Sequence, residues 1–165
     1  MEKEHTVYEA EGIGIVMALH MLKTSNRQLT RPLSICSDSQ ALLKALGNQR
    51  PHVGHYILDK IHDSAESLHA KQDDLINRSE HLETLAEGRE WKGSTNRVID
   101  LQMHWVPGHS RYECNEKADE EAKKAAQGLS SKAKSLPLFL RKCLPASISA
   151  LCQNFLTSIL KTWKH

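Results

Sequence analysis

The feature that most constrains the fold is a pair of short strand-type runs set among longer helical segments. The first run covers residues 33–37, is largely apolar, and follows a polar loop that ends at Pro32. The second covers residues 98–106. With period-two spacing, one of its sides carries Ile99, Leu101, Met103 and Trp105. Helical segments before, between and after these runs predict an α/β fold.

The expected helices are residues 7–23, residues 39–47, a long segment after Pro51, residues 115–127, and residues 148–163. Thr6 and Glu9 have the spacing of a capping box at the start of the first. Gly12 and Gly14 inside that helix cost about 1 kcal/mol each against alanine, which indicates either close packing or a degraded sequence. Residues 71–97 are polar, so we expect a surface insertion with a short helix near residues 79–87.

Composition sets the broad class of the protein. A chain of 165 residues has room for one domain and a tail, and its net charge of +2 permits nucleic-acid binding without requiring it. The four cysteines have no CxxC spacing and no secretory segment precedes them, so the sequence predicts a reduced, intracellular chain that is not secreted. No run of 18 apolar residues occurs, and we therefore expect no membrane span and no membrane partner.

Three carboxylates lie at the edges of expected elements. Glu11 is in the first turns of a helix, Asp38 follows a strand, and Asp119 is one turn into a later helix. Clustered carboxylates repel one another unless hard cations such as Mg2+ or Mn2+ bind them. Two such ions about 4 Å apart can hold the attacking water and the leaving oxygen of a phosphodiester. His109, on a Pro-Gly turn, could then relay a proton.

Each of these residues also has a simpler interpretation. Glu11 could be an acid favoured by the helix dipole, Asp38 could be the N-cap of the next helix, and Asp119 could be a solvated helical acid. His109 could be a turn residue without chemistry. A zinc site built on His104, His109 and Cys114 is disfavoured, because no fourth ligand is evident and His104 lies on a strand.

Three sequence blocks, taken together, resemble a known family. They are Tyr8-Glu-Ala-Glu11, Ser37-Asp-Ser-Gln40, and Trp105-Val-Pro-Gly-His109 followed by Asn115-Glu-Lys-Ala-Asp119. In order and spacing they resemble the type 1 ribonuclease H domain, most closely that of fungal non-LTR retrotransposons. The similarity runs from about Thr6 to Ala126, apart from the polar insertion.

The resemblance implies a function and a site. Such domains cut the RNA strand of an RNA/DNA hybrid with Mg2+ or Mn2+. Glu11, Asp38 and Asp119 match the metal-binding carboxylates, and His109 matches the histidine of a flexible loop. Gln40 and Asn115 match substrate-binding positions, Gln40 in the minor groove where the 2′-hydroxyl identifies RNA.

The chain departs from the family before Glu11. The family's first catalytic aspartate lies on a strand upstream, and only ten residues precede Glu11 here. The resemblance therefore implies an α/β ribonuclease H-like fold without its first three strands, leaving two parallel strands, flanking helices and a C-terminal helical tail. The strand edge and helix faces left uncovered could be covered by the C-terminal helix at residues 148–163, by a second copy of the chain, or by the missing segment supplied from another polypeptide. We expect a partial domain at residues 1–128 and a linker with a helix at 129–165.

Loss of one carboxylate predicts a weak or inactive enzyme, because phosphoryl chemistry depends on positioning. The alternative function is a catalytically inactive nucleic-acid-binding or interaction module on the same scaffold. A degenerate product without a selected role is a further alternative.

Overall fold

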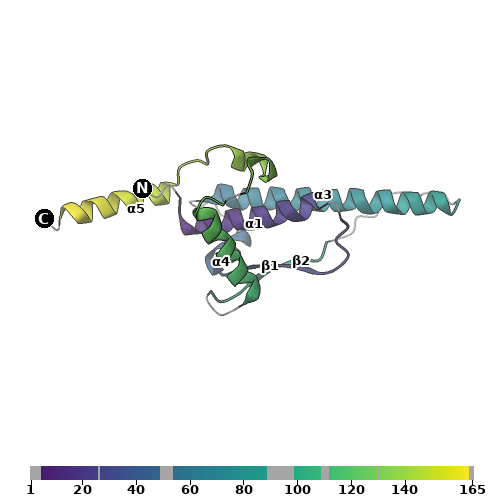
Figure 1. Ribbon diagram of the computed structural model, residues 1–165, viewed down its shortest axis with the longest axis horizontal. Helices are drawn as coiled ribbons and strands as arrows, with labels where there is room; N and C mark the ends of the chain where they lie inside the picture. The colour runs from purple at the N-terminus through teal and green to yellow at the C-terminus, as the bar shows by residue number, and fades with distance from the viewer. Residues whose placement is uncertain are drawn as a thin grey trace.

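The computed structural model describes residues 5–25, 27–48, 54–88, 99–108, 112–129 and 131–163, without the side chain of residue 114. Its elements, in chain order, are α1 (Val7–Thr24), β1 (Leu33–Ser37), α2 (Gln40–Leu46), α3 (His55–Ala86), β2 (Leu101–Trp105), α4 (Glu113–Ala126), two short 3-10 helices (Ala133–Ser135 and Leu138–Arg141) and α5 (Ile148–Thr162). Helices alternate with two strands, as Figure 1 shows, so the expected α/β class is confirmed.

The two strands form one parallel sheet, paired from Leu33 opposite Leu101 to Ser37 opposite Trp105. Leu33 and Ile35 of β1 share the partly buried face with Leu101 and Met103 of β2. The predicted period of two is therefore confirmed for these residues.

Trp105 departs from that pattern. We expected its ring on the apolar side of the strand, but the residue is 50% exposed. Its Nε1–H donates a hydrogen bond to the backbone carbonyl of Asp38, at 3.1 Å. This bond holds the ring beside the end of β1 and away from the core.

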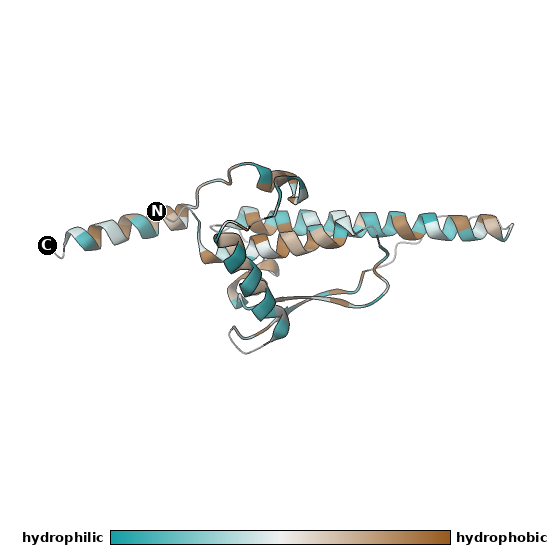
Figure 2. Ribbon diagram, in the orientation of Figure 1, coloured by the Kyte–Doolittle hydropathy of each residue, from teal (hydrophilic) through white to brown (hydrophobic). Residues whose placement is uncertain are grey.

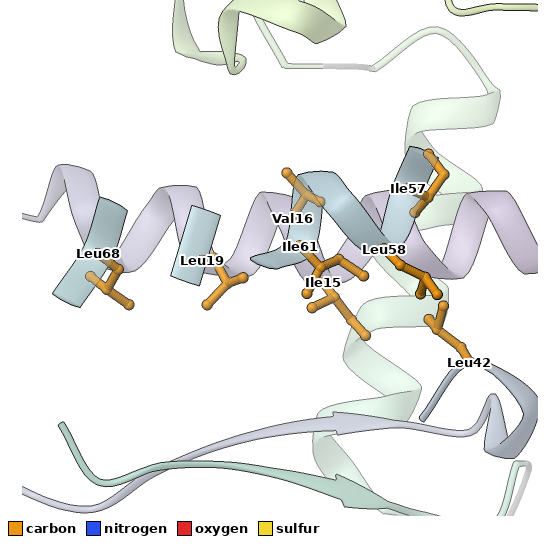
Figure 3. Close-up of a cluster of buried hydrophobic side chains, with 8 residues drawn as sticks. All are labelled: Ile15, Val16, Leu19, Leu42, Ile57, Leu58, Ile61 and Leu68. Carbon is orange, nitrogen blue, oxygen red and sulfur yellow. The ribbon is translucent and has the colours of Figure 1, made fainter. Parts of the chain in front are cut away.

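The core lies mainly between α1 and α3, which run side by side over the sheet (Figure 1). Figure 3 shows the buried side chains that form it: Ile15, Val16, Leu19, Leu42, Ile57, Leu58, Ile61 and Leu68. A Cβ atom at Gly12 would collide with Cγ2 of Ile57, whereas one at Gly14 would meet nothing within 4 Å. Close packing of the two helices therefore explains Gly12.

Helix α3 is a single helix of 32 residues, and the predicted surface insertion is wrong from residue 71 to residue 86. No glycine or proline interrupts the sequence between His55 and Glu87, so the helix continues although its second half is polar. Gln72 on this helix is buried and accepts a hydrogen bond from the Leu29 N–H at 2.8 Å. Residues 89–97 of the expected insertion lie outside the described residues.

The expected C-terminal helix is present as α5, and it extends away from the rest of the molecule (Figure 1). Six large apolar side chains on or beside it are exposed: Ile148, Leu151, Phe155, Leu156, Leu160 and Trp163. Only Ser147 and Ala150 at its start are buried. Helix α5 therefore does not cover α1, whose apolar face is buried by α3. No helix in the described ranges combines the length and the apolarity needed to cross a membrane.

Candidate functional site

A cavity of about 380 Å³ lies between α1, β1 and α4. The three predicted carboxylates, Glu11, Asp38 and Asp119, all line it, and Asn115 lines it as well. These residues come from three elements that are far apart in the sequence. We call this cavity the carboxylate pocket.

Glu11 is the member of the pocket whose ionisation is most affected. Its burial raises the pKa of the carboxyl, and the charges of Asp38 and Asp119 raise it further. A hydrogen bond from Ser37 lowers the pKa in part, without reversing the shift. The effect on the Glu11 pKa indicates that Asp38 and Asp119 both lie close enough to Glu11 to repel its negative charge.

Asp38 lies directly after β1, but it is not the N-cap of α2. That position belongs to Ser39, whose side chain accepts a hydrogen bond from the Leu42 N–H at 3.4 Å. The simpler interpretation of Asp38 is therefore wrong. Its carboxylate is left to line the pocket, while its backbone carbonyl accepts from the Trp105 ring.

The loop after β2 passes against the Asp38 carboxylate. A Cβ atom at Gly108 would lie 2.9 Å from Asp38 Oδ2, which is closer than real Cβ contacts. Only glycine lets the backbone approach the carboxylate in this way. His109 is the next residue, but it lies outside the described residues, so its predicted role stays a prediction.

Helix α4 supplies Asn115 and Asp119, which are one turn apart and both partly buried. Ala118 and Ala122 line the pocket beside them. Gln40, the first residue of α2, is exposed and does not line the pocket. The structure thus brings four of the six predicted site residues together and leaves Gln40 apart.

The donor chemistry of the pocket fits an oxygen-preferring cation, because all three ionisable ligands are carboxylates. The three carboxylates nevertheless lie too far apart to bind one metal ion together as they are placed here. Among the described residues, no three histidine, cysteine, aspartate or glutamate side chains lie close enough together to hold a metal ion. For the disfavoured zinc site, His104 is exposed and contacts Gln102, and the other two proposed ligands fall outside the described side chains.

A larger cavity, of about 580 Å³, lies between the start of α1 and the start of α5. Its carboxylate, Glu9, accepts a hydrogen bond from the Thr6 N–H at 2.8 Å and so completes the predicted capping box. Burial alone would raise the pKa of Glu9, but hydrogen bonds from Thr6 and Ser147 lower it overall. The Glu9 carboxylate therefore serves to cap α1 and to bond to Ser147. We place the candidate chemistry in the carboxylate pocket instead.

No protein-family model, no curated protein and no solved structure matches this chain. Support for a function therefore comes from the sequence blocks and from the geometry of the pocket.

Three residues of the site were not predicted from sequence. Ser37 bonds to Glu11, Gly108 packs on Asp38, and Trp105 bonds to the Asp38 backbone. All three fall within the blocks that suggested the site. Their contacts could not be predicted from the local sequence, because each contact joins two elements that are far apart in the chain.

Proposed function

We propose that this chain is a metal-dependent endonuclease of the ribonuclease H type 1 class, acting on the RNA strand of RNA/DNA hybrids. The single observation that carries the proposal is the convergence of Glu11, Asp38 and Asp119 on one pocket. A position where burial and two neighbouring acids raise the pKa of a third acid is unfavourable for folding alone. Such a cost is common where carboxylates serve binding or catalysis.

In this proposal Glu11, Asp38 and Asp119 would hold Mg2+ or Mn2+ after drawing closer together than they lie in this structure. The bound ions would supply the Lewis acidity that activates water and stabilises the leaving oxygen of a phosphodiester. Gly108 lets the loop after β2 approach Asp38 and so helps to orient that carboxylate. Asn115 contacts the substrate at the pocket, Gln40 contacts it at the start of α2, and His109 transfers a proton.

The second candidate is a nucleic-acid-binding module that keeps the scaffold without turnover. The spacing of the carboxylates favours it, because no three of the described ligand-type side chains form a metal-holding group. Such a module would bind hybrids chiefly through phosphate contacts, with an affinity that falls as salt rises.

Cleavage of a labelled RNA/DNA hybrid, in Mg2+ and separately in Mn2+, tests the proposal. We expect slow cleavage that Asp38→Asn abolishes. The control Asp63→Asn removes one exposed carboxylate from α3 and should leave cleavage unchanged. Salt-sensitive binding without cleavage in either metal would favour the binding module and overturn the nuclease proposal.

A further inference from the structure

A second group of metal-ligand side chains lies on α3, away from the carboxylate pocket. His69 and Asp73 are four residues apart on this helix, and His69 Nδ1 lies 3.2 Å from Asp73 Oδ2. Side chains at this spacing face each other on one side of a helix. Asp73 is mostly buried, with only 17% of its side chain exposed.

Two oxygens on this face of α3 lack hydrogen-bond partners. Asp73 Oδ1 and Asn77 Oδ1 are both buried, and neither has a donor in the part of the chain that the structure describes. A buried carboxylate oxygen without a partner costs free energy, so such atoms point to a group that is absent from the protein chain itself. Asn77 is one turn beyond Asp73, which places the two oxygens on the same face.

We propose that His69 and Asp73 bind a divalent cation of the borderline class represented by Zn2+. Ligands at the bond lengths typical of tetrahedral zinc lie about 3.3 Å from each other. The separation of 3.2 Å between His69 Nδ1 and Asp73 Oδ2 matches that value. Imidazole with carboxylate suits zinc, copper or nickel, whereas magnesium prefers oxygen ligands alone.

The surroundings of the pair favour a cation. The neighbouring Lys71 directs its ammonium to the backbone carbonyl of Lys23, at 2.6 Å, on another side of the helix. Asn77 Oδ1 is an acceptor for a water molecule on the ion. Water completes the coordination, so the site is weaker than a four-ligand structural site.

The same histidine and carboxylate spacing recurs earlier on α3. His55 and Asp59 lie 3.5 Å apart, and His62 and Glu66 have the same spacing in sequence. Asp59 is 60% exposed, so its interaction with a cation is more strongly screened than that of Asp73. As Zn2+ is added, we therefore expect the His69 and Asp73 pair to bind it before the other two pairs do.

Titration with Zn2+ alone, followed through the imidazole NMR signals of the full chain, tests the site. We expect the His69 signals to respond at a Zn2+ concentration at least tenfold below that for His20. His20 is the control because it lies on α1, and Val16 and Thr24, four residues away on either side, carry neither an imidazole nor a carboxylate. Equal responses of His69 and His20 would overturn the proposal and leave a metal-free ion pair.

Two variants at adjacent positions distinguish direct binding of Zn2+ by Asp73 from a general electrostatic attraction of cations to α3. Asp73→Asn should weaken the Zn2+ response of His69 at least tenfold, whereas Asp74→Asn should leave it unchanged. Both variants remove one charge from adjacent positions of α3, and Asp74 is exposed. Equal weakening by the two variants would contradict the site. Neither variant touches the carboxylate pocket, so hybrid cleavage provides an independent readout.

Discussion

At the scale of single residues, Glu11 has opposing effects on stability and on function. Its pKa is raised in the folded protein by burial and by Asp38 and Asp119, so the folded state binds the proton more tightly than the unfolded chain. Stability attributable to Glu11 therefore falls as pH rises through its ordinary value of 4.5 towards the raised one. At neutral pH the ionised Glu11 destabilises the fold.

Glu11→Gln should consequently raise the melting temperature at pH 7, by about 1–3 °C. The gain should disappear near about pH 3.5, where Glu11 is protonated in both states. Thermal denaturation at the two pH values measures it. Glu66→Gln removes an exposed acid from the middle of α3 and should change neither melting temperature. A lower melting temperature for Glu11→Gln at pH 7 would contradict the repulsion.

The two glycines of α1 provide a matched pair of substitutions. Gly12→Ala should destabilise the protein by about 1–3 kcal/mol, because the added methyl group collides with Ile57. Gly14→Ala should stabilise it by about 0.5–1 kcal/mol, because alanine favours the helix and the position is open. Urea denaturation of both variants measures the difference. Changes of the same sign would show that α1 and α3 do not pack as closely as described.

At the scale of elements, one side chain of α3 fastens the loop between α1 and β1. The Gln72 side chain accepts from the Leu29 N–H at 2.8 Å, and its Nε2 donates to the Arg27 carbonyl at 2.9 Å. The Gln72 side chain is buried, so its amide depends on these two bonds for its hydrogen-bond partners. This clamp sets where the chain enters β1 relative to the helices.

Gln72→Met keeps the approximate volume and removes both hydrogen bonds. We expect it to destabilise the fold by about 1–2 kcal/mol, because the Leu29 N–H and the Arg27 carbonyl both lose their partner on α3. Hydrogen exchange should then increase at the Leu29 amide. Gln28→Met is the control, since Gln28 bonds to Leu75 from an exposed position and should cost much less. Unchanged exchange at Leu29 would mean that the clamp does not hold the loop.

The elements that the sequence predicted correctly are those with local signals. The Thr6 capping box predicts the start of α1, the short apolar run predicts β1, and the period-two pattern predicts most of β2. The polarity of residues 71–86 predicts an insertion, and the unbroken length of α3 shows that this prediction is wrong. A polar helix without glycine or proline continues regardless, and here Gln72 and Leu68 anchor it to the core.

The candidate site was predictable only in part, for a related reason. Its acids could be placed at element edges from local patterns and from the resemblance. The approach of Gly108 to Asp38 and the bond from Trp105 depend on how β2 lies beside β1. Such contacts follow from tertiary packing, which no local pattern specifies.

At the scale of the whole molecule, apolar surface is distributed unevenly. One face of the sheet contacts the core, while its other face exposes the polar residues Ser34, Cys36, Gln102 and His104. Six of the large apolar side chains that are exposed among the described residues lie on or beside α5, which carries both hydrophobic and hydrophilic segments (Figure 2). The stability of the body should therefore be nearly independent of most of α5.

Removal of residues 152–165 tests that independence while keeping the buried Ser147 and Ala150. The melting temperature should change by less than about 2 °C, because the lost side chains bury little surface. Binding of a hydrophobic dye and self-association in sedimentation should both fall, since Phe155, Leu156 and Leu160 leave the exposed surface. Thr157→Ala with Ser158→Ala alters only the polar face of α5 and should affect neither property. A loss of about 5 °C or more in the shortened chain would instead show that α5 stabilises the body. Such a result would contradict the position of α5 described here, in which its apolar side chains are exposed.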